Sequence, residues 1–182
     1  MSPVLDIKNL SKNFDSIEIL KNINISIDEG DFLVLVGPSG CGKSTLLNCI
    51  AGLEPISDGG IAISGQDMTH VSPKDRNIAM VFQSYALFPH LSVFENMAYG
   101  LKVRRESAPE IRKKVEGIAQ KLEILEFLKR KPNQLSGGQR QRAALGRLLA
   151  RDPKIHLFDE PLGNLDPQFR AGMRSELARL HR

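Results

Sequence analysis

The 182 residues are enough for one domain with a substantial core, and their 41% hydrophobic and 25% charged content is that of an ordinary soluble globular protein. No apolar stretch approaches the roughly 18 residues that span a bilayer, which excludes an integral membrane class. The net charge of +4 is small and its basic residues are interleaved with acids, so we interpret it as solvated helical faces and expect no nucleic-acid partner.

The N-terminus lacks the basic start and apolar stretch of a signal peptide, which predicts a cytosolic protein. Cys41 and Cys49 belong to no metal-ligand spacing. We interpret both as reduced thiols that serve as small apolar residues.

Strand patterns dominate the first half of the chain, where apolar residues alternate with polar ones or form short runs. In chain order the predicted strands are residues 4–8, Ile23–Ile27, Phe32–Val36, Ile61–Ile63 and Ile78–Phe82. Phe32–Val36 is expected to be fully buried, and Ser57–Gly60 is expected to be a turn.

Helix patterns dominate the second half, where Ser92 with Glu95 three residues later predicts a capped helix start. The predicted helices are Lys43–Ala51, one beginning at Ser92, Pro109–Leu128 with an interruption at Gly117, Gly137–Arg151 and Gln168–Arg182. A short buried strand, Ile155–Phe158, precedes the last helix. Strands that alternate with helices predict an α/β fold with a mainly parallel sheet.

A glycine-rich loop lies between the predicted strand Phe32–Val36 and the helix that follows. Gly37-Pro38-Ser39-Gly40-Cys41-Gly42-Lys43-Ser44, followed by Thr45, fits the pattern Gly-x4-Gly-Lys-Ser/Thr. Glycines allow backbone N–H groups to surround phosphate oxygens, and the positive end of the helix dipole faces the same ligand. The loop therefore predicts binding of a nucleoside triphosphate, with Lys43 on the β- and γ-phosphates and Ser44 on Mg²⁺.

A second acidic site is predicted where the strand Ile155–Phe158 ends. Asp159 is expected to hold Mg²⁺ through water, and Glu160 to polarise the water that attacks the γ-phosphate. His156, within the strand, is interpreted as a core or interface residue rather than a catalytic one.

A third motif, Leu135-Ser136-Gly137-Gly138-Gln139, predicts another anion-binding helix start, with Ser136 as N-cap. At this point the sequence resembles the ATP-binding-cassette (ABC) ATPases through essentially all 182 residues. The resemblance implies one ATP-binding domain over residues 1–182, with an N-terminal antiparallel β subdomain, a P-loop core and an α-helical subdomain at about 88–135. It also implies that this motif faces the phosphate loop of a second subunit, so that two head-to-tail copies enclose two ATP molecules.

The resemblance assigns further positions one at a time. Phe14 stands where an aromatic residue stacks on adenine, although a core role is an equal alternative. Gln83 is similar to the glutamine that contacts Mg²⁺ and the attacking water. Asp166 resembles the acid of a loop that crosses the dimer interface, where glycine (Gly163) replaces the usual serine.

Three stretches resemble importers of the maltose and glycerol-3-phosphate type: Gln83–His90, Glu95–Lys102 and Asp159–Asp166. This resemblance implies permease subunits as partners and a peripheral location on the cytoplasmic face of the membrane. Tyr85, Leu87, Phe88 and Leu91 are expected either to receive a permease helix or to pack the helical subdomain.

The resemblance also implies a switch histidine and a regulatory domain beyond the end of this chain; His181 is not taken as that histidine. A truncated ATPase domain is therefore expected. Its function is interpreted as ATP hydrolysis that energises import of a sugar or a similar solute. Three alternatives stay open: an importer of another solute (polyamine, osmolyte or anion), a non-transport ABC ATPase, and a non-hydrolysing nucleotide-binding fragment. A P-loop kinase is disfavoured because it leaves Leu135–Gln139 unexplained.

Overall fold

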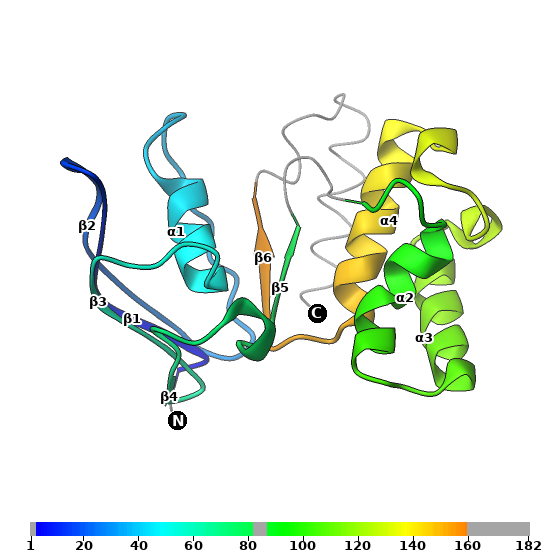
Figure 1. The fold of residues 1–182 in the computed structure, drawn as a ribbon, viewed down its shortest axis with the longest axis horizontal. Helices are drawn as coiled ribbons and strands as arrows, with labels where there is room; N and C mark the ends of the chain where they lie inside the picture. Colours follow the sequence, from blue (N-terminus) through cyan, green and yellow to red (C-terminus); the bar gives the residue numbers. More distant parts are fainter. Residues whose placement is uncertain (1–2, 82–86, 160–182) are drawn as a thin grey trace. The chain divides into compact units, whose positions relative to one another are not determined.

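The computed structural model describes residues 3–81 and 87–159 of the chain (Figure 1). Contacts divide the chain into two compact units, with the boundary between Ile78 and Ala79. The first unit combines an antiparallel sheet with the helix α1, and the second is mainly helical.

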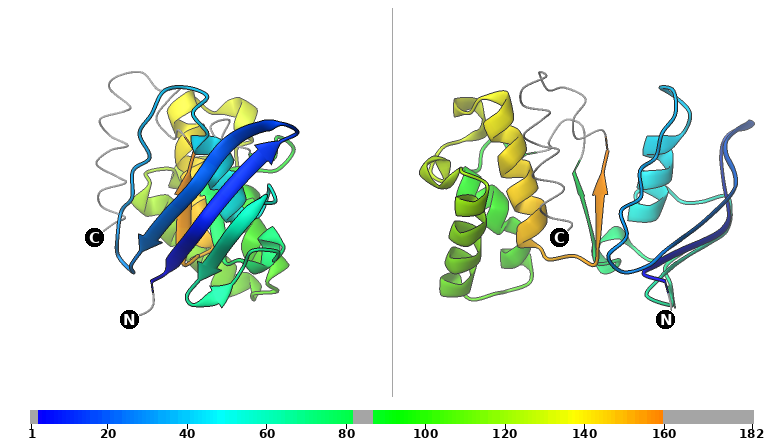
Figure 2. Two further views of the ribbon diagram at one scale, coloured as in Figure 1. Left: turned by 90° about the vertical axis from the view of Figure 1, so that its left-hand side faces the viewer. Right: turned by 180° about the vertical axis from the view of Figure 1, so that it is seen from behind.

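The sheet of the first unit has the order β2-β1-β3-β4, and all its neighbours are antiparallel (Figure 2). Its strands are β1 (Leu5–Phe14), β2 (Ile17–Ile27), β3 (Asp58–Ile63) and β4 (Gln66–Asp67). Leu5 lies opposite Ile27 on one side and Ile63 on the other, which sets the register of the sheet. The buried side chains of β1, Leu5, Ile7 and Leu10, contribute to the core of this unit.

The helix α1 (Lys43–Ala51) lies on one face of this sheet (Figures 1 and 2). It begins after Gly42 and ends at Gly52, as the sequence predicts, and its side chains Leu46, Cys49 and Ile50 are buried. A short 3₁₀ helix, η1 (Pro73–Asp75), lies between β4 and the end of the unit. The glycine-rich loop before α1 is therefore continuous with a helix that is packed in the core of this unit.

The second unit pairs β5 (Ile78–Val81) with β6 (Ile155–Phe158), and the two strands run in the same direction (Figure 1). Its α-helices are α2 (Val93–Val103), α3 (Ala108–Lys121) and α4 (Gly137–Ala150), joined by the 3₁₀ helices η2 (Leu125–Phe127) and η3 (Pro132–Gln134). One hydrophobic cluster includes side chains from all three α-helices, such as Met97, Val115 and Leu145. The capping box predicted at Ser92 and Glu95 is confirmed.

The prediction of a buried strand at Phe32–Val36 is wrong for this structure. The segment is assigned to no strand, and Val34 and Val36 are 62% and 91% exposed. An apolar stretch becomes a strand only where a neighbour accepts and donates the ladder hydrogen bonds. In the described sheet β1 already pairs on both sides, with β2 and β3, and no ladder among the described residues includes this segment.

Two further predictions are corrected by pairing and packing. Ser57–Gly60 is not a turn, because β3 begins at Asp58 and pairs with β1 through Gly60. A Cβ atom at Gly59 would overlap the backbone at Asn9, where the register of β1 shifts, and the positive φ of 88° suits glycine. Gly117 does not interrupt α3, because burial of Val115 and Ala119 on the core outweighs the roughly 1 kcal/mol cost of a helical glycine.

The predicted α/β fold with an antiparallel sheet and helices is confirmed. Within the described residues its parallel part consists of β5 and β6. The limits of a helical subdomain at about 88–135 stay a prediction, and the predicted helix Gln168–Arg182 lies outside the described residues. Among the described residues, no helix combines the length and the hydropathy that crossing a membrane requires.

Candidate functional site

The phosphate loop turns sharply into α1. Gly40 and Gly42 have φ values of 81° and 94°, a conformation that side chains with a Cβ rarely adopt. Gly42 is the N-cap of α1, and no side chain caps the helix there. The first turn of α1 contains no acidic residue either, so the positive end of its dipole is not neutralised from within the helix.

Gly42 also packs closely against β2. A Cβ atom at this position would lie 2.9 Å from Cδ2 of Leu20 and 3.3 Å from the carbonyl oxygen of Ile19. The loop therefore lies close to β2 at Gly42, and a larger residue there would require Leu20 or Ile19 to shift. A loop held close to the sheet in this way has a defined backbone path, which a phosphate site built from backbone N–H groups requires.

The ammonium group of Lys43 lies over the loop. Its Nζ donates hydrogen bonds to the carbonyl oxygens of Gly37 and Pro38, each at 2.9 Å, and lies 3.7 Å from Sγ of Cys41. Carbonyl dipoles compensate a positive charge only in part, so an anionic oxygen at the same place would make stronger hydrogen bonds. The loop thus combines a helix start that no side chain caps with a half-buried cation, and this donor set fits a triphosphate with its Mg²⁺.

The two cysteines differ from each other in environment. Cys49 is buried in α1, and burial raises the pKa of its thiol, so it serves as the small apolar residue that we expected. Cys41 is exposed in the phosphate loop, and that interpretation is therefore wrong for this residue. Both are free thiols, as predicted.

Phe14 ends β1 and is 43% exposed, which contradicts the alternative that it is a core residue. The ammonium group of Lys12 lies 4.5 Å from the centroid of the Phe14 ring. The exposed ring belongs to the same unit as the phosphate loop.

The acidic residues follow β6 in the second unit. The N–H of Asp159 donates to the carbonyl oxygen of Val81 at 3.0 Å, which extends the pairing of β5 and β6 to this residue. His156 is exposed on β6 with its ring stacked on that of Phe158, which contradicts a core position and leaves the interface alternative as a prediction. Glu160, Gln83, Gly163 and Asp166 lie outside the described residues.

Ser136 is the N-cap of α4, as the sequence predicts. Its hydroxyl oxygen accepts a hydrogen bond from the N–H of Gln139 at 3.3 Å, and its own N–H donates to Oε1 of Gln139 at 2.9 Å. This reciprocal box does not engage the N–H groups of Gly137 and Gly138, which begin the helix. Because the Ser136 hydroxyl oxygen accepts in this box, the box does not use the hydroxyl proton.

The segment from Tyr85 to Leu91 is expected from the sequence either to receive a permease helix or to pack the helical subdomain, and it lies partly within the described residues. Leu87 packs against the helical core, and the ring of Phe88 lies 4.9 Å from that of Tyr99. The guanidinium carbon of Arg147 lies 5.5 Å from the centroid of Phe88. These contacts favour the packing alternative for Leu87 and Phe88, while Tyr85 is outside the described residues.

The sequence patterns do not indicate that four polar residues are buried: Lys12, Arg76, Asn96 and Gln141. The side chain of Asn96 holds the loop before α2, because it accepts from the N–H of Phe88 at 2.8 Å and donates to the carbonyl oxygens of Phe88, Leu91 and Ser92. No local signal marks Lys12 or Arg76, because partners such as Pro55 and Cys49 are brought to them by the fold.

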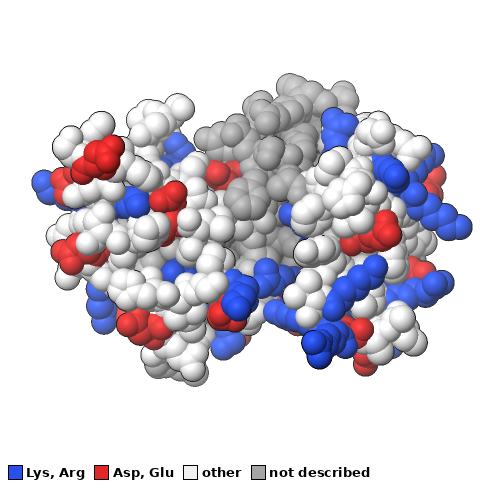
Figure 3. Space-filling model, in the orientation of Figure 1, with Lys and Arg blue, Asp and Glu red and all other residues white. Residues whose placement is uncertain are grey.

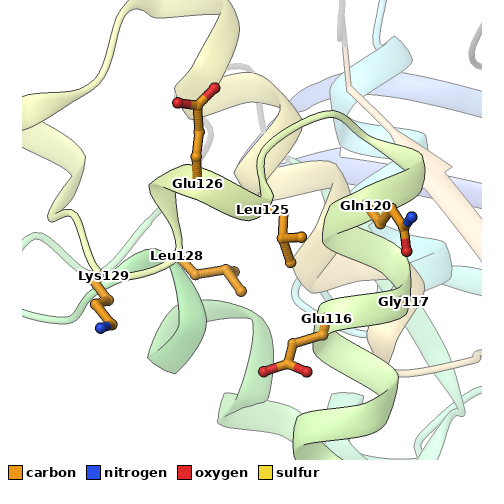
Figure 4. A pocket seen from close by; sticks show the side chains of 7 residues that line it. All are labelled: Glu116, Gly117, Gln120, Leu125, Glu126, Leu128 and Lys129. Atoms are coloured by element: carbon orange, nitrogen blue, oxygen red, sulfur yellow. The ribbon is translucent and has the colours of Figure 1, made fainter.

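A shallow pocket of about 670 Å³ lies elsewhere, between α3 and η2 (Figure 4). It is lined by Glu116, Gly117, Gln120, Leu125, Glu126, Leu128 and Lys129, and none of these is a predicted site residue.

On the face drawn in Figure 3, Lys and Arg lie among Asp and Glu, which supports the interpretation of the net charge as solvated surface.

Comparison with known proteins relates this arrangement to one family. The sequence profile of the ABC transporter family matches residues 20–163. The chain is 56% identical over 178 residues to the sn-glycerol-3-phosphate import ATP-binding protein UgpC 2 of Rhizobium johnstonii, which covers 98% of this chain and 52% of that protein. It is 53% identical over 179 residues to the sn-glycerol-3-phosphate import ATP-binding protein UgpC of Bordetella avium, covering 98% and 50%.

A solved structure of an ATP-binding cassette of an ABC transporter matches with a TM-score of 0.88 and 26% identity, covering 100% of this chain and 78% of that one. The chain spans about half the length of the curated relatives that it matches. The family profile nevertheless covers most of the present residues, including the phosphate loop, Asp159 and the Ser136 motif. The chain belongs to the ABC transporter family.

Proposed function

We propose that this chain is the ATP-binding and ATP-hydrolysing part of an ABC importer subunit, and that it energises uptake of a sugar or a similar small solute. The observation that carries the proposal is the uncapped start of α1 at Gly42, with the Lys43 ammonium held over the loop. Membership of the ABC transporter family supports the same reading. Two relatives are named for import of sn-glycerol-3-phosphate, which supports a small polar solute.

The phosphate loop would bind the nucleotide through residues Gly37, Pro38, Ser39, Gly40, Cys41, Gly42, Lys43, Ser44 and Thr45. Lys43 would exchange its hydrogen bonds to loop carbonyls for β- and γ-phosphate oxygens, which are stronger acceptors because they are charged. Phe14 would stack on adenine from its exposed position at the end of β1.

The reaction requires charge neutralisation and a positioned water. Mg²⁺, when bound, neutralises phosphate charge; Ser44, Asp159 and Gln83 are the proposed residues around it. Glu160 would accept a proton from the attacking water, and Gln83 would orient that water. Asp159 is positioned by the pairing of its N–H with Val81 at the end of β5 and β6.

One chain supplies two different halves of a site, which supports a head-to-tail dimer. Ser136, Gly137, Gly138 and Gln139 of a second copy would close on the γ-phosphate. The capping box fixes the Ser136 hydroxyl while leaving the glycine N–H groups out of its hydrogen bonds. Asp166 would cross the interface between the copies.

The proposed partners are a second ATPase subunit, identical or paralogous, and the permease subunits of the importer. The chain would attach to the cytoplasmic face of the membrane through the permease alone. Residues 1–182 would form one ATP-binding domain, with the helices at about 88–135 as its helical subdomain. Cys41 would remain a reduced thiol there.

The direct test is ATP-dependent association and phosphate release. Sedimentation of the chain with Mg²⁺ and ATP should show a dimer that is absent with AMP, and phosphate release should rise with the square of the protein concentration at low concentration. Association without phosphate release would favour the alternative of a non-hydrolysing nucleotide-binding fragment. Binding of neither ATP nor its analogues would overturn the proposal.

A further inference from the structure

Lys12 is a buried lysine whose role neither the fold nor the nucleotide chemistry has explained. Only 6% of the residue is exposed, although lysine is rarely buried unless its charge is paired. It lies on the core face of β1 beyond Leu5, Ile7 and Leu10, where shifts in register interrupt the regular alternation of the strand.

Three groups compensate the Lys12 charge. Its Nζ donates to the carbonyl oxygen of Pro55 at 2.8 Å and lies 3.2 Å from Oε2 of Glu54. The third group is the ring of Phe14, whose centroid is 4.5 Å from Nζ. A cation this close to an aromatic face is attracted by the ring quadrupole, and the attraction strengthens where water is excluded.

The partners of Lys12 connect β1 to the phosphate-binding helix. Glu54 and Pro55 follow the end of α1 at Gly52, and the N–H of Glu54 donates to the carbonyl oxygen of Asn48 within α1 at 3.3 Å.

Two further hydrogen bonds tie the same segment to the end of β1. The N–H of Ser57 donates to the carbonyl oxygen of Ser11 at 2.8 Å, and Oγ of Ser57 accepts from the N–H of Asn13 at 2.9 Å. The Phe14 ring is therefore held relative to α1 by both backbone and side chain.

We propose that Lys12 is a positioning residue for nucleotide binding: its ammonium covers one face of Phe14, fixes the ring relative to α1, and so prepares the ring for stacking on adenine. This inference rests on the proposed function, because it requires that Phe14 receives the base. A ring that is 43% exposed, with a cation close over it, retains free surface for a ligand. The cation also withdraws electron density from the ring, which strengthens stacking on an electron-rich purine.

The proposal separates binding of the base from binding of the phosphates. Lys12 contacts the ring, Glu54 and Pro55, and none of these three belongs to the phosphate loop. Removing its charge should therefore weaken binding of ATP but leave binding of inorganic triphosphate unchanged. If Lys12 had only a structural role, its replacement would lower the affinity for both ligands together, because the phosphate loop lies close to the sheet that contains Lys12.

The test compares Lys12→Met with Lys8→Met in the full chain. Lys8 lies on the same strand with a 75% exposed side chain, and its ion pair is with Asp6. Calorimetric titration with Mg·ATP should show Kd raised about five- to thirtyfold by Lys12→Met, a range expected for loss of a desolvated cation–π contact. Inorganic triphosphate should bind both variants within about twofold of the unchanged protein.

A double-mutant cycle with Phe14→Leu tests the contact itself. Lys12→Met should have little further effect on the Kd for ATP once Phe14 is replaced, whereas independent effects of the two changes would overturn the proposal. Lys12→Arg retains a cation and should retain ATP affinity to within about threefold. Should Lys12→Met fail to fold, Lys12→Gln removes the charge while keeping a donor for Pro55, and the same selective loss is expected.

The outcomes distinguish the two proposals. Equal losses for ATP and triphosphate, or no loss for either, in Lys12→Met would overturn the role of Lys12 and leave the proposed function intact. Failure of the unchanged protein to bind ATP would overturn the proposed function and this inference with it.

Discussion

The guanidinium of Arg76 donates a hydrogen bond to the carbonyl oxygen of Cys49 at 2.9 Å, at the end of α1 opposite the phosphate loop. The same nitrogen donates to Ile50 at 2.9 Å, and Nε donates to Val71 at 2.8 Å. Burial lowers the pKa of Arg76, which is 3% exposed. A cation at a helix C-terminus stabilises the dipole and satisfies carbonyl groups that have no partner within the helix.

Arg76→Met should therefore destabilise the protein by about 2–4 kcal/mol, because buried carbonyl groups lose charged donors. Urea unfolding measures the change. Lys74→Met, an exposed neighbour in η1, is the matched control and should stay within about 0.5 kcal/mol of the unchanged protein. Similar unfolding midpoints for the two variants would contradict the assigned role of Arg76.

Asn96→Asp should destabilise the loop before α2 by about 2–4 kcal/mol. A carboxylate at this position would face three carbonyl oxygens that the amide nitrogen now donates to, and it would be buried. Thermal unfolding and hydrogen exchange at the Phe88 N–H report the change. Asn133→Asp makes the same chemical replacement at an exposed site and should leave both readouts nearly unchanged.

The capping boxes Ser92–Glu95 at the start of α2 and Ser107–Glu110 at the start of α3 should be visible in an acid titration. Hydrogen bonds from the Ser92 N–H and hydroxyl hold the pKa of Glu95 below its ordinary value of 4.5, and the Ser107 hydroxyl and N–H do the same to the pKa of Glu110. Because these folded-state pKa values are lowered, their stabilising effect is present above the unfolded value and is lost as pH falls through the folded one.

Carboxyl NMR of Ser92→Ala should show the pKa of Glu95 moving up towards 4.5, since the hydroxyl donor is gone. The pKa of Glu110 should not move, because its donors belong to Ser107. A Glu95 titration unaffected by this substitution would show that the Ser92 hydroxyl is not a source of the shift.

Glu160→Gln should keep Mg·ATP affinity within about twofold while phosphate release from the full-length protein falls by at least about 100-fold. The amide retains the size of the carboxylate and cannot accept the proton of the attacking water. Glu126→Gln, at the pocket beside α3, should leave release unchanged. Near-normal release from Glu160→Gln would rule out Glu160 as the general base.

The sequence predicts those elements whose signals are local. Gly42 and Gly52 delimit α1, and the Ser92–Glu95 and Ser136–Gln139 boxes begin α2 and α4 where expected. Each signal depends on residues within one turn of the helix, so a single sequence contains all that is needed.

Features that depend on distant partners are predicted less completely, although the paired strands β5 and β6 are found where the sequence places them. Phe32–Val36 has the composition of a strand, yet strand formation requires a neighbour that its own residues do not specify. Lys12 and Arg76 resemble surface residues in the sequence. Their burial is possible because they donate hydrogen bonds to the carbonyl oxygens of Pro55 and Cys49, which are distant in the chain. The same holds for the candidate site. The phosphate loop can be predicted from its sequence motif, whereas the contact between Lys12 and Phe14 can be seen only in the structure.

The loop from Gly37 to Thr45 is proposed to bind the triphosphate of ATP. Calorimetric titration of the full chain with Mg·ATP, compared with Lys43→Met and with Lys74→Met as the control for lost charge, measures this directly. The unchanged protein and Lys74→Met should bind equally, and Lys43→Met should lose at least about tenfold in affinity because charged hydrogen bonds to phosphate are removed. Equal ATP affinity in all three proteins would contradict the account.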